Sequence, residues 1–145
     1  MENYRKHLRD MSILVLVFAA IGCVRAILNV FMMDFNMEAL PDGATAGIVL
    51  VSQIIMTVFM LIFAIPDFYI GVKGLKISKN PDSSKAHIVW ATILAVLSGL
   101  GVLSYISSLT QGDIVNGLIN VIGTALDVAI YVLYIICAKK VRQAA

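Results

Sequence analysis

The sequence predicts an all-α integral membrane protein, arranged as a bundle of four transmembrane helices. Of its 145 residues, 60% are hydrophobic and 14% are charged, and the mean hydropathy is +0.92. A soluble domain of this size would be about half apolar and about a quarter charged, because most of its surface faces water. The composition therefore excludes an ordinary soluble fold and places any function within or beside a bilayer.

Four apolar runs define the predicted helices: residues 11–33, 46–72, 86–109 and 114–138. At about 1.5 Å per residue, each run can cross roughly 30 Å of hydrocarbon. Together they occupy most of the chain and leave only short connections. Residues 1–145 are therefore predicted to form a single four-span membrane domain.

The first run follows a basic segment, as the apolar core of a secretory signal does. It continues without a polar interruption to residue 33, which is too long for a signal core, so we expect an uncleaved membrane helix. Its polar and small residues Gly22, Arg25 and Asn29 recur at a helical spacing and share one face.

The second run carries Gln53 on its polar face and the pair Pro66 and Asp67 near its end. Proline removes a backbone hydrogen bond and frees a carbonyl one turn earlier, so Pro66 is predicted to kink the helix or, as the alternative, to break it. Transporters use such breaks to build ion sites. We expect Asp67 to reach water or to pair with Lys73, and the alternative is an ion site beside the freed carbonyl.

Residues 73–85 are predicted to form a basic cytoplasmic loop with Lys73, Lys76, Lys79 and Lys85. The sequence Asn80-Pro81-Asp82 indicates a turn, after which Asp82 or Ser83 is expected to cap the third helix. The lysines set topology first, and a docking surface for anionic lipid head groups or a protein partner is the second interpretation.

The fourth run has the clearest polar face of the four. Its polar and small residues recur every three or four positions: Asn116, Asn120, Gly123, Asp127, Tyr131 and Tyr134. The third run carries a similar face and, beside it, a ridge of small residues that permits close helix approach. Four faces of this kind indicate a polar bundle core or an oligomer axis.

Charge predicts the orientation of the spans. Apart from Arg25, the Lys and Arg residues precede the first run, lie between the second and third, or follow the fourth. The other two connections carry no base. The positive-inside rule therefore places both termini in the cytoplasm. The expected location is a bacterial inner membrane, with which the lack of a glycosylation sequon is compatible.

Three ionisable residues lie within the runs: Arg25, Asp67 and Asp127. Counted from the cytoplasmic ends of the runs, Arg25 lies roughly 21 Å deep, Asp127 roughly 16 Å and Asp67 about 8 Å. We therefore predict an ion pair between Arg25 and Asp127, with Asn29, Asn120 and Tyr131 satisfying their remaining donors and acceptors.

The favoured function is movement of a small cation, a proton or a polar solute through an oligomeric, polar-cored helix bundle, because ionisable residues in spans usually serve function. Asp127 would bind the cation, Asp67 would form the cytoplasmic gate, and Gln53, Asn116 and Asn120 would line the route. The alternative is a non-transporting accessory or interaction subunit whose buried charges serve helix assembly.

An enzyme is not expected, because the sequence shows no clear nucleophile-base or metal constellation. Cys23 and Cys137 are too far apart for a redox pair, and His7 and His87 lie at predicted helix ends without partner ligands. We expect no metal, cofactor or nucleic acid. The expected partners are the lipid bilayer, anionic lipid head groups and a second copy of the chain, with a membrane or cytoplasmic protein as an alternative.

Overall fold

The computed structural model describes residues 2–31, 46–109 and 114–143, all but a short connection of which are helical. The helices are α1 (Glu2–Phe31), α2 (Ala46–Lys79), α3 (Ala86–Leu109) and α4 (Ile114–Gln143). Each is long and apolar enough to cross a membrane. The prediction of an all-helical fold with four apolar helices long enough to span a membrane is confirmed for the described residues.

The helices extend beyond the apolar runs at the ends that carry Lys and Arg. Helix α1 begins at Glu2 instead of residue 11, α2 continues to Lys79 instead of ending at residue 72, and α4 continues to Gln143. Hydropathy identifies only the apolar part of a helix, which can lie in hydrocarbon. The helix itself continues through polar residues, because their long side chains can reach water. Lys73, Lys76 and Lys79 therefore belong to α2, which corrects the predicted loop at 73–85.

Helix α2 is continuous through Pro66, so the alternative of a broken helix at this residue is wrong. Proline removes one backbone hydrogen bond, while the remaining bonds of a long helix still hold each turn. In an apolar environment a broken helix would expose several unpaired backbone groups, which costs more than the one lost bond.

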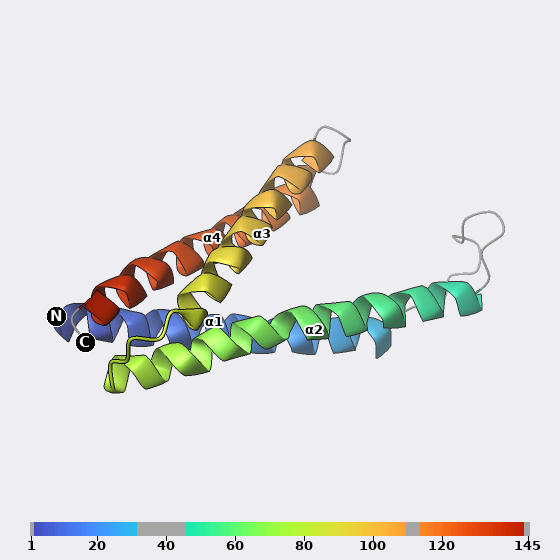
Figure 1. Ribbon diagram of the computed structural model, residues 1–145. Coiled ribbons are helices and arrows are strands. Elements are labelled where there is room, and N and C mark those ends of the chain that lie inside the picture. Colours follow the sequence, from blue (N-terminus) through green and yellow to red (C-terminus); the bar gives the residue numbers. More distant parts are fainter. Residues whose placement is uncertain (1, 32–45, 110–113, 144–145) are drawn as a thin grey trace.

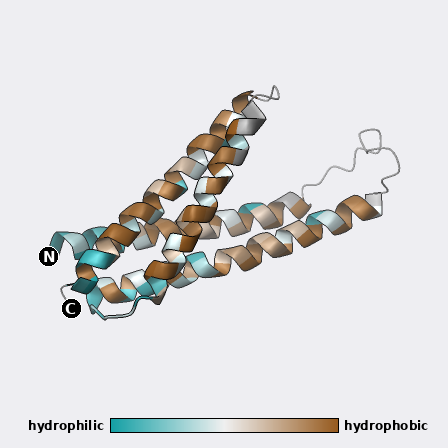
Figure 2. Cartoon of the chain, turned by 45° about the horizontal axis from the view of Figure 1, so that its top comes forward, coloured by the Kyte–Doolittle hydropathy of each residue, from teal (hydrophilic) through white to brown (hydrophobic). Residues whose placement is uncertain are grey.

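The four helices form two hairpins, α1 with α2 and α3 with α4, and the members of each hairpin pack closely. The hairpins meet at the end where both termini and the α2–α3 connection lie, and they diverge toward the opposite end (Figure 1). The divergence is also plain in Figure 2. We call these the basic end and the open end. The basic end carries Arg5, Lys6, Arg9, Lys73, Lys76, Lys79, Lys85, Lys139, Lys140 and Arg142.

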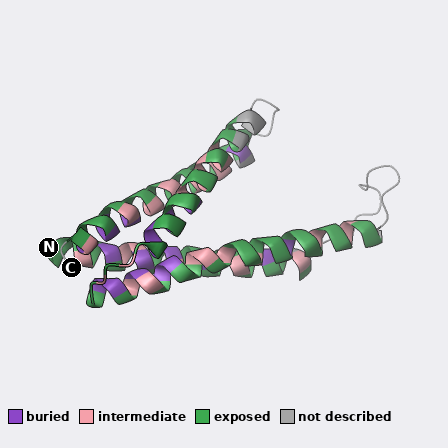
Figure 3. Ribbon diagram, in the orientation of Figure 1, coloured by how far each residue is buried: buried purple, intermediate pink, exposed green. Residues whose placement is uncertain are grey.

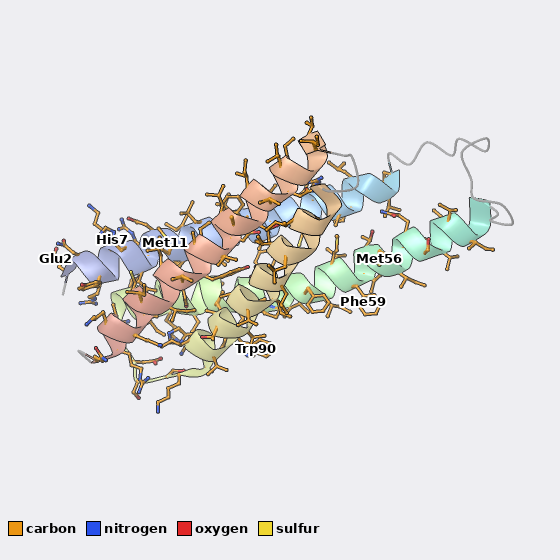
Figure 4. All side chains as sticks on the ribbon, turned by 90° about the horizontal axis from the view of Figure 1, so that it is seen from above. Glu2, His7, Met11, Met56, Phe59 and Trp90 are labelled. Carbon is orange, nitrogen blue, oxygen red and sulfur yellow. The ribbon has the colours of Figure 1, made fainter. Side chains whose placement is uncertain are left out.

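The buried core lies near the basic end, where all four helices contribute to it (Figure 3). Its fully buried side chains include Leu8 of α1, Ile70 of α2 and Tyr134 of α4. Elsewhere large apolar side chains are exposed, as Met56, Phe59 and Trp90 illustrate (Figure 4). In a bilayer such side chains face lipid tails, so their exposure suits a membrane-spanning chain.

Close approach in the core depends on two glycines of α2 that face α1. A Cβ atom built on Gly74 would lie 2.6 Å from Cε2 of Tyr134 and closer still to Oγ of Ser12. One built on Gly71 would lie 2.6 Å from Cγ of Leu16. The Ser12 hydroxyl, fully buried, donates a hydrogen bond to the carbonyl of Leu8 at 2.6 Å. Gly74 thus marks a level at which α1, α2 and α4 meet.

His87 lies at the start of α3, at the helix end predicted for it, and is fully buried beside this level. Its ring packs edge-on against that of Tyr134, with the ring centroids 6.1 Å apart. Neither ring nitrogen has a hydrogen-bond partner among the described residues. The first turn of α3 thus contributes His87 to the buried core.

The connection between α2 and α3 is held by polar contacts. Lys73 Nζ forms an ion pair with Asp82 at 2.8 Å, and the other carboxylate oxygen accepts a hydrogen bond from the Ser84 backbone N–H at 2.6 Å. Arg5 donates to the carbonyls of Ser78, at 3.0 Å, and Lys79. Asp82 therefore organises its own turn and does not cap α3, which begins at Ala86.

Replacing Gly74 by Ala should lower the free energy of unfolding by about 1–3 kcal/mol, because the added methyl group must displace the packed ring of Tyr134. Gly99→Ala is the matched control, since a Cβ atom built on Gly99 would meet nothing within 4 Å. The control should be neutral or more stable, because alanine favours a helix over glycine. Thermal unfolding in detergent checks both variants, and equal stability of the two would contradict the packing described.

The Lys73 and Ser84 hydrogen bonds hold the pKa of the Asp82 carboxyl below its ordinary value of 3.8. Asp82 therefore stabilises the fold fully above that ordinary pKa, and the contribution is lost as the pH falls through the lowered pKa. The stability advantage of the wild type over Asp82→Asn should shrink as the pH is lowered from about 5 toward 2. Unfolding midpoints across this range test the expectation, which a pH-independent difference would contradict.

Candidate functional site

A cavity of about 800 Å³ lies between the two hairpins, on the open-end side of the core. All four helices line it, and most of its wall is apolar. The polar side chains at its surface are Arg25, Asp67, Ser98, Asp127 and Tyr131. The structure thus brings the three ionisable residues predicted to matter to one cavity.

Asp67 and Asp127 lie at about the same distance from the core. Gly74 of α2 and Tyr134 of α4 meet in the core, and each carboxylate lies about two helical turns, or roughly 10 Å, from that contact. Asp67 comes from the first hairpin and Asp127 from the second, and both side chains are half-buried. The two carboxylates therefore enter one level of the cavity from opposite hairpins.

Tyr131 links the two hairpins at this level. Its hydroxyl donates a hydrogen bond to the carboxylate of Asp67 at 2.6 Å. One turn closer to the basic end, the Tyr134 hydroxyl donates to the Ile70 carbonyl at 2.9 Å. The backbones of α2 and α4 make little direct contact, so these tyrosines span the distance between them.

The sequence pattern predicts Tyr131 beside Asp127 and does not identify its bond to Asp67. A usable signal is present, because Asp67 and Ile70 have the same separation in α2 as Tyr131 and Tyr134 have in α4. Two helices packed side by side can repeat one contact at each turn. The spacing alone, however, does not show which turns face each other.

The predicted ion pair between Arg25 and Asp127 does not form. In the described part of the chain the ion pairs are Arg9 with Asp10 and Lys73 with Asp82. Arg25 lies about 20 Å along α1 from Ser12, roughly twice the distance of the carboxylates from the same core level. Arg25 is exposed on the open-end side of the cavity.

The expected pair of Asp67 with Lys73 is also not formed, because α2 continues as a helix past both residues. Six residues apart, they point to different sides of that helix. Lys73 is then directed toward Asp82, while Asp67 faces the cavity. Asp67 lies about 18 Å from the end of α2 at Lys79, because the helix continues through residues 73–79.

The remaining predicted residues either do not line the cavity or have side chains outside the described part of the structure. Gln53 and Asn120 are half-buried and are not among the residues that line it. The side chains of Asn29 and Asn116 lie outside the described part of the structure. Within the described ranges, no three His, Cys, Asp or Glu side chains are grouped closely enough to hold a metal ion.

Comparisons of the chain with known protein families, curated proteins and solved structures give no match. The geometry of the cavity is therefore the basis on which a function is argued.

Double-mutant cycles should separate the bond that forms from the pair that does not. Tyr131→Phe combined with Asp67→Ala should show a coupling energy of about 1 kcal/mol, the size measured for hydrogen bonds between membrane helices. Arg25→Ala combined with Asp127→Ala should be additive within about 0.5 kcal/mol. Unfolding by denaturing detergent in mixed micelles gives both values. A larger coupling for Arg25 and Asp127 would contradict the assignment.

Proposed function

We propose that this protein moves a small cation, a proton or a polar solute across a membrane, through the cavity between its hairpins. The observation that supports this most is the pair of carboxylates, Asp67 and Asp127, at one level of a cavity within apolar helices. Ionisable side chains at such depth are costly and usually mark the path or binding site of an ion.

Each polar residue has a role in this proposal. Asp127 receives the cation, because its carboxylate lines the cavity and has no hydrogen-bond or ion-pair partner among the described residues. Asp67, held by Tyr131, forms the inner limit of the pathway. Arg25 lies nearer the open end, where its positive charge moderates the attraction of cations into the cavity.

Passage to the basic end requires movement of the core. Leu8, Ile70, His87 and Tyr134 fill the space between the carboxylates and that end, and all four are fully buried. Among the described residues, this core closes the cavity toward the basic end. Alternating access, in which hairpins rock about a fixed site, would open the other direction.

The proposed assembly is an oligomer, most simply a symmetric dimer. The two hairpins diverge toward the open end, and a second copy would cover the cavity from the side. By the positive-inside rule the basic end faces the cytoplasm, with both termini there. Anionic lipid head groups would contact its lysines and arginines, and a bacterial inner membrane remains the proposed location.

The accessory role is the second candidate. The largely apolar cavity wall and the divergence of the hairpins favour it, since one helix of a membrane partner could lie between them. Under this alternative Asp67 and Asp127 would pair with a polar or basic group of that helix, as buried charges that fix assembly do.

Flux measurements in proteoliposomes test the proposal. Wild-type protein should give saturable flux of protons or monovalent cations, Asp127→Asn should reduce it to the level of empty liposomes, and Asp67→Asn should reduce it. Asp10→Asn is the matched control, because Asp10 pairs with Arg9 near the basic end and not with a cavity residue. This control should keep wild-type flux.

The opposite result would favour the accessory role. Absence of flux for protons, monovalent cations and anions, from protein that is folded and correctly inserted, would contradict transport. Crosslinking through the lysines of the basic end would then be used to capture a partner.

A further inference from the structure

The size and lining of the cavity exceed what a proton or a metal cation needs. Its volume of about 800 Å³ lies in the range of pockets for small organic molecules, roughly 300–1,000 Å³. A single water molecule takes only about 30 Å³ in the liquid. An inorganic ion alone would contact the polar side chains and would leave most of the apolar wall without a partner in the cavity.

The apolar wall is formed on both sides of the carboxylates. Phe18 of α1 and Met60 and Phe63 of α2 form one side, and Leu97 of α3 and Ile130 of α4 form the other. All three residues of the first side line the cavity, and they are between 44% and 59% exposed. Aromatic rings attract organic cations through their faces, and methionine adapts to varied shapes.

The ionised side chains of the cavity determine which net charge a bound molecule should carry. Asp67 and Asp127 oppose one guanidinium, that of Arg25, so the ionised side chains carry a formal excess of one negative charge. Asp127 has no hydrogen bond or ion pair within the described residues. A ligand with a single positive charge near Asp127 would neutralise the excess negative charge of the cavity, whereas an anion would be repelled by two carboxylates.

We infer that the cavity binds an amphipathic organic monocation, with its charged centre at Asp127 and Asp67 and its apolar body between the walls built on Phe63 and Leu97. The inference rests on the proposed function, because it names the substrate class of the same site. Arg25, roughly 10 Å nearer the open end than the carboxylates, disfavours a second positive charge on the bound molecule.

Two probes of equal shape and opposite charge test the inference: tetraphenylphosphonium and tetraphenylborate. With the purified full chain in a nonionic detergent, equilibrium dialysis should show saturable binding of the phosphonium and weak, unsaturable uptake of the borate. Tetramethylammonium, which has the charge without the large apolar body, should compete poorly. Equal binding of the two tetraphenyl ions would show apolar partitioning only and would overturn the inference.

Variants assign the binding to the cavity. Asp127→Asn should weaken phosphonium binding about tenfold or more, through loss of the unpaired charge, and Phe63→Ala should weaken it through loss of the aromatic wall. Asp10→Asn should bind like the wild type. Size-exclusion profiles and helical circular dichroism identify any variant that fails to fold. Unchanged binding in folded Asp127→Asn and Phe63→Ala proteins would also overturn the inference.

Failure here is distinguishable from failure of the proposed function. Phosphonium binding without any flux in proteoliposomes would uphold the ligand class and reject transport. Flux of small inorganic cations without phosphonium binding would uphold transport and reject the organic monocation.

Discussion

The contact of Tyr134 with α2 determines how the two hairpins fit together. The fully buried ring packs against Gly74, where a Cβ atom has no room, and its hydroxyl bonds to the Ile70 carbonyl. This contact sets the position of α4 along α2. The Tyr131 hydroxyl then reaches Asp67, and Asp127, one turn from Tyr131 along α4, lines the cavity across from Asp67. The shared level of the two carboxylates is thus a consequence of packing near the basic end.

Hydropathy and charge were sufficient to predict the four apolar helices, because both depend only on the composition of each run. The helix ends were not predictable in the same way. Residues 73–79 look like a basic loop by composition, yet they continue α2 and bring Lys73 within reach of Asp82. The predicted pair of Asp67 with Lys73 took Lys73 as part of a loop, whereas the continuous helix directs these two side chains to different sides.

The polar residues of the cavity were identified from the sequence, but their pairing was not. The cavity is lined by four predicted residues, Arg25, Asp67, Asp127 and Tyr131. They were predictable because periodicity shows which residues share a face of one helix. Which residue meets which depends on how far each helix is shifted along its neighbour. That shift is set by contacts such as Gly74 with Ser12 and Tyr134, which involve three helices at once and leave no pattern in any single one.

Because the hairpins meet only near the basic end, a small rotation there moves their far ends by a much larger distance. Helix α4 has 30 residues and is about 45 Å long, so a rotation of about 5° at the basic end displaces its far end by about 4 Å. A shift of a few tenths of an ångström among the side chains around Gly74 is therefore amplified at the mouth of the cavity. Substitutions in the core can tune the width of that opening without altering any residue that lines it.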